Sequence, residues 1–295
     1  MLVTGIQPAQ VLGLKESPDP IDIGSRDSCD KHRNEGGGGP RSQLSQGPAP
    51  LTVVILIGMA VTVFLTSLLS GIFGMAGGLI LLWVLLFLFP VSTAIAIHGV
   101  IQMVSNGSRA WFSRAYIDYR ILGILGLGLV ISSIILLIVD YQPDLIVVSI
   151  AIGLMPILVW MPVSKLRLNA SKPLHALACG LIAGALTVGV GVSGPTIDIF
   201  FIRTTMDRRK VIATKAAVQV ASHATKVVFY WNAASELPTT EWIAVLVAAP
   251  IAILGARAGN DILQKMTDQN FRAWTRWIVT GVGAVYFTQG LLKLI

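Results

Sequence analysis

Charged residues are scarce in this chain. Only 13% of its 295 residues are Asp, Glu, Lys or Arg, against about 25% in an average soluble domain. Hydrophobic residues account for 54%, and the mean hydropathy is +0.74. The composition therefore excludes an ordinary water-soluble fold and predicts a multi-pass membrane protein, in contact with the lipid bilayer. The formal net charge is +7, but the basic residues stand singly in short connections, so no nucleic-acid partner is expected.

Cysteine is rare, and a phosphate-binding motif is missing. The two cysteines, Cys29 and Cys179, belong to no CxxC or His-paired spacing, which argues against a disulfide and against a metal site. The glycine clusters GIFGMAGG at 71–78 and GVGVSGP at 189–195 are not followed by Gly-Lys-Ser/Thr, as a phosphate-binding loop requires. We therefore expect no metal, no cofactor and no ATP-driven pump.

The first fifty residues lack sustained helical or strand periodicity. They contain SPDP, GGGGP and GPAP, and such proline-rich and glycine-rich segments are typical of disorder. The opening MLVTGIQPAQ has neither the basic start nor the compact apolar core of a signal peptide. Residues 1–50 are therefore predicted to be a disordered N-terminal tail.

From residue 51 the chain consists of apolar segments separated by short polar connections. The segments cover approximately 51–74, 77–89, 93–112, 121–139, 145–160, 174–190, 195–202, 211–231, 242–256 and 273–291. A helix needs about 20 residues to cross a bilayer, and 77–89 and 195–202 are shorter and follow glycine-rich breaks. They predict broken or half helices, which a bilayer tolerates where the irregular backbone is buried in protein or lines a cavity. The expected fold is an all-α polytopic membrane helix bundle.

The basic residues predict the orientation of the connections. The positive-inside rule places the connections after residue 112, at 161–173 and at 203–210 in the cytoplasm. The loops at 140–144 and 232–241 carry Asp and Glu but no Lys or Arg, in agreement with the outer face.

These assignments are consistent only if each half holds an odd number of passes. The two halves are then inverted relative to each other. We predict a first transmembrane repeat at 51–160, a cytoplasmic linker at 161–173 and a second transmembrane repeat at 174–295.

A shift of the sequence by 117 residues supports this internal repeat. It places Ala94–Trp111 on Val211–Val228 and pairs the polar residues of the two segments. The pairs are His98 with Lys215, Gln102 with Gln219, Ser105 with Ser222, Asn106 with His223 and Arg109 with Lys226. Spacings of four, three and four residues put most of them on one helix face. Each half therefore presents one polar stripe.

A glycine-rich break precedes each stripe, GIFGMAGG at 71–78 and GVGVSGP at 189–195. Interrupted apolar segments at corresponding places in two inverted halves indicate a transporter site near the bilayer midplane. Half-helix N-termini would direct backbone N–H groups at that site, which favours an anion.

Intramembrane ionisable residues are functional candidates because burying a charge there is costly. Lys215 ranks first, since it heads its stripe four residues inside the span. The predicted binding residues for a small anionic solute are Lys215, His98, Gln102, Gln219, Ser193, Gly77, Gly78, Gly194, Arg109 and Lys226. For Arg109 and Lys226 snorkelling to the interface is an alternative, and for the glutamines interhelical hydrogen bonding is one.

Two residues are candidates for a coupled proton. His223 lies on the second stripe, and Asp198 is the only acidic residue inside an apolar span. A salt bridge from Asp198 to Lys215 or Lys226 is the competing interpretation.

The repeated order of these motifs resembles the TauE/SafE family of sulfite exporter-like transporters. The motifs are GIFGMAGG, the polar helix TAIAIHGVIQMVSNGSRAW and the exit SRAYIDYR, followed by GVGVSGP and VIATKAAVQVASHATK. The resemblance covers about residues 51–295. It implies a secondary transporter, not an enzyme, that moves sulfite, organosulfonates or related sulfur oxyanions across the inner membrane. We expect alternating access by relative movement of the two repeats.

Two alternatives belong to other functional classes. Gly191-Val-Ser193-Gly194 resembles the GxSG motif of rhomboid intramembrane proteases, with His223 as a conceivable base. The first half has Asn106 where His223 aligns. The repeated helical framework is therefore present in both halves, but the pair of serine and histidine is not. A passive anion channel is the other alternative. The sequence leaves open the anion, the direction of transport, the coupling ion and the oligomeric state.

Overall fold

The computed structural model describes residues 50–161 and 167–295. The predicted tail therefore lies outside the described residues except for Pro50, and so does part of the predicted linker, at 162–166. Over the described ranges the protein is all-helical, with eleven α-helices and one short 3-10 helix, as the sequence predicts.

The helices follow the predicted segments closely, with the largest differences at the end of α10 and at the start of α11. The first half holds α1 (Pro50–Phe73), α2 (Ala76–Leu88), α3 (Val91–Phe112), η1 (Arg114–Tyr116), α4 (Tyr119–Ile138) and α5 (Leu145–Trp160). The second half holds α6 (Pro173–Gly189), α7 (Gly194–Phe201), α8 (Arg208–Phe229), α9 (Trp231–Ser235), α10 (Thr239–Leu263) and α11 (Asp268–Leu294). Carboxylate N-caps at Asp118, Asp144 and Asp207 begin α4, α5 and α8.

Both glycine-rich clusters break a helix, as predicted. The chain turns at Gly74, with φ 70°, between α1 and α2, and at Gly191, with φ 89°, between α6 and α7. An L-residue with a side chain is strained in this left-handed region, which explains why glycine stands at both turns.

The last carbonyls of α6, just before the break, accept hydrogen bonds from side chains elsewhere in the fold. The Tyr141 and Tyr230 hydroxyls donate to the carbonyl oxygens of Gly189 and Val188, at 2.9 and 2.7 Å. The last carbonyls of a helix have no partner within the helix, and inside a bilayer water does not replace one. These tyrosines therefore make the break compatible with burial.

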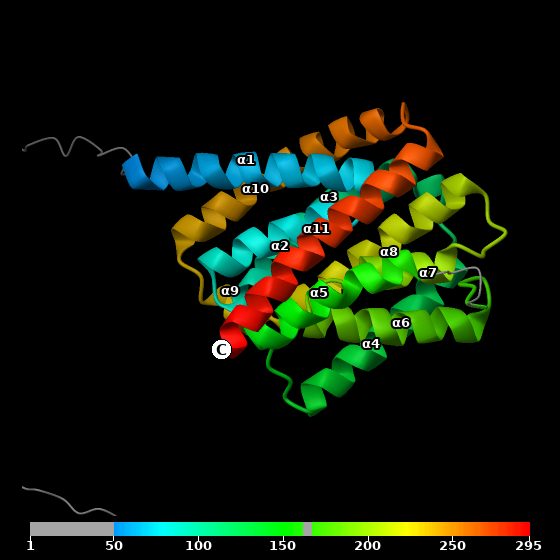
Figure 1. Cartoon of the computed structure of the whole chain (residues 1–295), viewed down its shortest axis with the longest axis horizontal. Helices are drawn as coiled ribbons and strands as arrows, with labels where there is room; N and C mark the ends of the chain where they lie inside the picture. Colours follow the sequence, from blue (N-terminus) through cyan, green and yellow to red (C-terminus); the bar gives the residue numbers. More distant parts are fainter. Residues whose placement is uncertain (1–49, 162–166) are drawn as a thin grey trace, which may run out of the picture. The chain divides into compact units, whose positions relative to one another are not determined.

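The helices pack in pairs that cross between the two halves. In Figure 1, α1 lies beside α10 and α4 lies beside α6, and these are among the most extensive helix contacts. The other extensive contacts join α5 to α11 and α3 to α8. Each half therefore contributes helices to the packing of the other half.

Close backbone approach at glycines explains two of these pairs. A Cβ at Gly128 of α4 would lie 2.6 Å from the Leu177 carbonyl oxygen of α6, and Gly180 of α6 packs on Leu125 of α4. A Cβ at Gly255 of α10 would lie 2.5 Å from the Phe64 carbonyl oxygen of α1. Small residues at such crossings are the usual means by which membrane helices approach each other.

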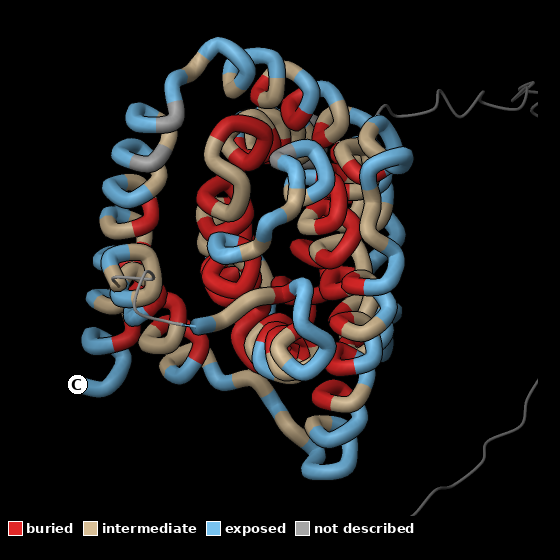
Figure 2. Tube along the Cα trace, turned by 90° about the vertical axis from the view of Figure 1, so that its right-hand side faces the viewer, coloured by how far each residue is buried: buried red, intermediate tan, exposed pale blue. Residues whose placement is uncertain are grey.

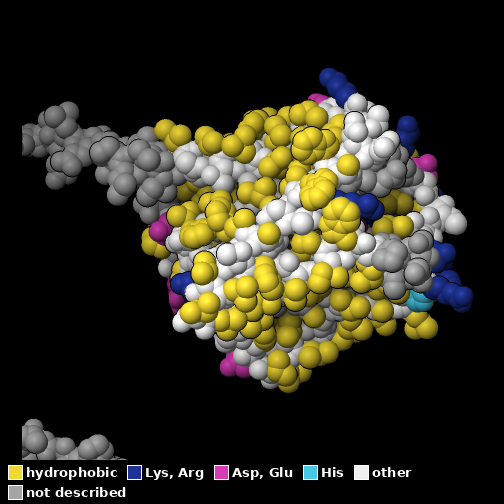
Figure 3. Space-filling model, viewed as in Figure 1, with side chains coloured by type: hydrophobic (Ala, Val, Ile, Leu, Met, Phe, Trp, Pro, Cys, Tyr) yellow, Lys and Arg dark blue, Asp and Glu magenta, His cyan; other side chains and the backbone are white. Residues whose placement is uncertain are grey.

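Buried residues face the interior of the bundle, and exposed residues face outwards, as Figure 2 shows. Many of the exposed side chains are large and apolar, and Figure 3 shows them spread over the helices, while Lys and Arg gather mostly at the end that holds the α7–α8 and α10–α11 connections. By length and composition, three described helical stretches can cross a membrane: Leu56–Phe73, Tyr119–Ile138 and Glu241–Leu263. Shorter apolar helices lie at Ala76–Leu88, Leu145–Trp160 and Pro173–Gly189.

Candidate functional site

A small polar cavity lies where the two helix breaks meet the polar faces of α3 and α8. Its volume is about 30 Å³, two to three times the roughly 10–15 Å³ that a cavity needs to hold one water molecule. The lining residues come from both halves: Gly74, Met75, Gly78, Leu79, His98, Gln102, Asn106, Val192, Ser193, Gly194, Pro195, Gln219, Ser222 and His223.

Seven of the predicted site residues line this cavity. They are His98, Gln102, Gln219, Ser193, Gly78, Gly194 and His223. The antiparallel packing of α3 and α8 explains why both stripes reach one cavity. Asp118, beyond the end of α3, donates its backbone N–H to Thr214 near the start of α8, at 2.9 Å. At the opposite end His98 contacts Lys226.

The remaining predicted residues lie around the cavity and are not among its lining. Gly77 packs against α1, where a Cβ would lie 2.5 Å from the Ser70 backbone nitrogen. Arg109, Lys215, Lys226 and Asp198 take part in polar contacts at the two ends of the stripes.

Lys226 is the most deeply buried cation among the described residues. Its exposed fraction is 0%. The Nζ atom lies 2.5 Å from Nδ1 of His98 and donates to the Gly191 carbonyl oxygen at 2.8 Å. The side chain therefore joins α8 to α3 and to the second helix break. Lys226 does not line the cavity itself, but it contacts His98, which does.

Several buried polar atoms around the cavity have no hydrogen-bond partner within the described ranges. They include Nε2 of His98, Nδ1 of His223 and the Ser222 hydroxyl. The two imidazole rings pack edge to face, with centroids 5.6 Å apart. Buried polar groups normally find partners, and unpartnered ones are costly. Their concentration here identifies a place where a polar ligand would be stabilised.

Two helices begin at this cavity. Gly78 lies in the first turn of α2, and Gly194 is the first residue of α7. The first N–H groups of a helix have no acceptor within the helix, and the helix dipole adds partial positive charge there. The glycines also allow close packing, because a Cβ at Gly194 would lie 2.7 Å from Cβ of Met75, and Gly78 packs directly on the Gln102 amide.

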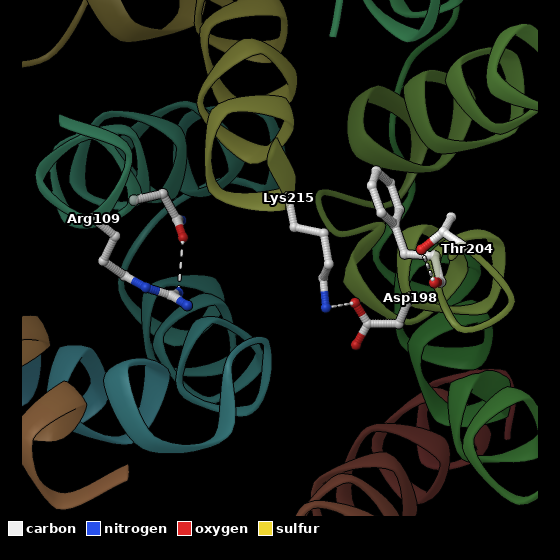
Figure 4. A network of polar contacts seen from close by, with 6 residues as sticks. Arg109, Asp198, Thr204 and Lys215 are labelled. Carbon is white, nitrogen blue, oxygen red and sulfur yellow. Dashed lines mark hydrogen bonds and ion pairs between the residues drawn. The ribbon is translucent and has the colours of Figure 1, made fainter. Parts of the chain in front are cut away.

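A second polar cluster lies toward the start of α8. Lys215 of α8 forms an ion pair with Asp198 of α7, and their side chains are 28% and 32% exposed. Figure 4 shows this pair together with Arg109 of α3, whose guanidinium donates to Asn106 at 3.4 Å. Of the two interpretations of Asp198, the ion pair with Lys215 is the one observed.

Ser193 is hydrogen-bonded to Thr187, with the two hydroxyl oxygens 2.6 Å apart. Its hydroxyl therefore pairs with a neighbouring hydroxyl at the same break. In the described part of the chain, no three His, Cys, Asp or Glu side chains come together as a metal site.

Sequence reasoning missed some of the lining. Asn106 and Ser222 belong to the aligned stripes, so the repeat itself gave a signal for them. Met75 and Val192 are apolar residues at the breaks, and their residue types carry no signal.

Comparison with known proteins gives one family. The family described as "Sulfite exporter TauE/SafE" matches residues 59–286. Neither the curated proteins nor the solved structures give a match.

Proposed function

The chain belongs to the sulfite exporter TauE/SafE family, and from this premise we propose that it moves a small sulfur-containing anion through the cavity between its two helix breaks. Members of this family are membrane transporters rather than enzymes, and the chain is accordingly a multi-pass membrane protein. The substrate is sulfite, an organosulfonate or a related oxyanion.

The lining of the cavity is the observation that carries the proposal. An oxyanion is bound best by several N–H or O–H donors that converge where water is excluded. Gln102 and Gln219 offer side-chain amides, and His98 offers an unpartnered ring nitrogen. The starts of α2 and α7 add backbone N–H groups and a favourable dipole.

The packing of the helices supports an inverted repeat. A shift of 117 residues carries α1 onto α6 and α4 onto α10, so the contact of α1 with α10 becomes the contact of α6 with α4. The same shift carries α3 onto α8, and it carries α5 onto a range that overlaps the start of α11; the helices of each pair contact each other. Two repeats that pack in this reciprocal way can move relative to each other while keeping one shared site.

The size and the ends of the cavity support alternating access. About 30 Å³ is only two to three times the roughly 10–15 Å³ that one water molecule needs, so we propose that the repeats separate to admit an oxyanion. At one end Lys226 and His98 are buried, whereas at the other end Lys215 and Asp198 are partly exposed. We therefore propose that the Lys215 end opens first, toward the cytoplasm. His223 and Asp198 remain the candidates for a coupled proton.

Flux into proteoliposomes tests the proposal. Sulfite, sulfate, thiosulfate, sulfoacetate and taurine are offered separately at two pH gradients. We expect saturable flux of at least one of them, and loss of that flux in the double variant Gln102→Leu/Gln219→Leu. Lys210→Met, at an exposed position of α8, is the matched control.

Three other outcomes would contradict the proposal. Flux that does not saturate and ignores the pH gradient would identify an anion channel. Proteolysis that disappears in Ser193→Ala would identify the protease alternative. Undiminished flux in a correctly folded glutamine double variant would place the anion elsewhere.

A further inference from the structure

We propose that Lys226 is a positioning residue that fixes His98 as a hydrogen-bond donor to the transported anion. This inference rests on the proposed function, because it assigns a role within the same cavity. Lys226 acts on the anion through the imidazole ring and does not contact it.

The ring of His98 lies between the buried cation and the cavity. Its Nδ1 atom is 2.5 Å from Nζ of Lys226. Its Nε2 atom is buried without a partner among the described residues, and His98 belongs to the cavity lining. One nitrogen is therefore committed to Lys226, and the other is available to a ligand.

The donors and acceptors decide where the imidazole proton lies. While Lys226 is an ammonium it has three donors and no acceptor, so Nδ1 accepts from it and the ring proton lies on Nε2. If the shared proton moves from Nζ to Nδ1, the ring becomes an imidazolium, and Nε2 still carries its hydrogen. Both arrangements present an N–H to the cavity.

The Gly191 carbonyl holds the ammonium in this position. Lys226 donates to that oxygen at 2.8 Å, and Gly191 is the residue that turns the chain between α6 and α7. The Cε and Cγ atoms of Lys226 pack on Gly99 of α3, where a Cβ would lie 3.0 and 3.2 Å from them. The side chain is thus fixed by α3, α8 and the second break together.

The other charged and titratable groups near the pair leave this assignment unchanged. His223 of α8 faces His98 edge to face, with the ring centroids 5.6 Å apart. Within the described ranges Lys226 has no carboxylate partner, and Asp198 of α7 pairs with Lys215 at the other end of the stripes. An anion that enters the cavity would supply the negative charge that the Lys226–His98 pair lacks among the described residues. An imidazole that is hydrogen-bonded to a buried cation and donates its N–H to the cavity favours an anion over a neutral solute of similar size.

Nitrogen-15 NMR of histidine-labelled protein in the absence of substrate is the first test. His98→Gln identifies the His98 signals. We expect a protonated Nε2 and a hydrogen-bonded Nδ1 in the unaltered protein, and a mixture of the two tautomers in Lys226→Met. A His98 ring whose Nδ1 carries the only proton would overturn the proposal. This measurement requires no transport, so it remains informative if sulfite proves not to be the substrate.

Binding of sulfite to the purified protein is the second test, arranged as a double-mutant cycle. We expect Lys226→Met to weaken binding by at least about 2-fold, because only the His98 rings with the proton on Nε2 then donate to the anion. The side-chain amide introduced by His98→Gln can offer a donor independently of Lys226. Lys226→Met should therefore weaken binding much less in the His98→Gln background than in the unaltered protein.

An equal loss of affinity in both backgrounds would mean that Lys226 acts only through its charge or its packing, and would refute the positioning role. Lys210→Met, on the same helix and exposed, controls for the removal of a lysine charge. Thermal unfolding of each variant identifies any that fails to fold, and the tautomer of the unaltered protein then decides the question alone.

Discussion

Gly74 and Gly191 adopt the same left-handed backbone conformation 117 residues apart, with φ values of 70° and 89°. Each ends the helix before the cavity and allows the next helix to begin at it. This matched pair of turns relates the two halves at the level of the backbone.

The two turns are expected to differ in their tolerance of a side chain. Alanine at either position costs about 1–2 kcal/mol because φ is positive. At Gly191 the Cβ would also lie 2.9 Å from Leu82, whereas at Gly74 nothing lies within 4 Å. Gly191→Ala should therefore lower the unfolding temperature in detergent more than Gly74→Ala. Equal shifts would show that contact with Leu82 does not matter.

The crossing of α4 with α6 should be sensitive to small increases in size. Gly180→Ala drives a Cβ into the backbone of Leu125, and overpacking of this kind costs about 1–3 kcal/mol. Gly123→Ala is the matched control. Gly123 lies in α4, the helix of Leu125, and has open space around the new Cβ. Thermal unfolding in detergent measures both. A protein that tolerates Gly180→Ala as well as Gly123→Ala would contradict this account of the packing.

A substitution in α2 should disturb the cavity without removing any polar group. A Cβ at Gly78 would overlap the Gln102 amide, so Gly78→Ala must displace that side chain. We expect about a 10-fold weaker anion affinity, the effect of losing roughly 1.4 kcal/mol, with the fold retained. Anion binding is compared with that of Gly281→Ala in α11, where nothing lies within 4 Å of the added atom. Unchanged affinity would remove Gln102 from the site.

The ion pair at the other end of the stripes predicts opposite effects for its two partners. Lys215→Met should abolish anion flux, because it removes the half-buried cation of the second polar stripe. Asp198→Asn should strengthen anion binding at low salt, since the carboxylate no longer competes for Lys215. Stability should change by less than about 1 kcal/mol in each case, because the pair is partly exposed. Flux and thermal unfolding measure the two effects, and undiminished flux in Lys215→Met would remove Lys215 from the pathway.

Much of the fold followed from local pattern. Long apolar runs predict helices wherever they occur in a membrane, and the paired GIFGMAGG and GVGVSGP clusters predicted the two breaks at which Gly74 and Gly191 turn the chain. The 117-residue repeat also predicted which helix faces are polar, because a helix fixes the direction of its side chains from their spacing.

The distribution of roles along the polar stripes depended on tertiary structure. Spacing alone ranked Lys215 first and left Lys226 as a possible snorkelling residue. The antiparallel packing of α3 on α8 instead buries Lys226 against His98 and leaves Lys215 partly exposed beside Asp198. The sequence by itself determined an all-helical membrane protein with two glycine breaks and two polar faces. Only the tertiary structure decided which cation is buried, because burial depends on the helices that pack around a residue and not on its neighbours in the chain.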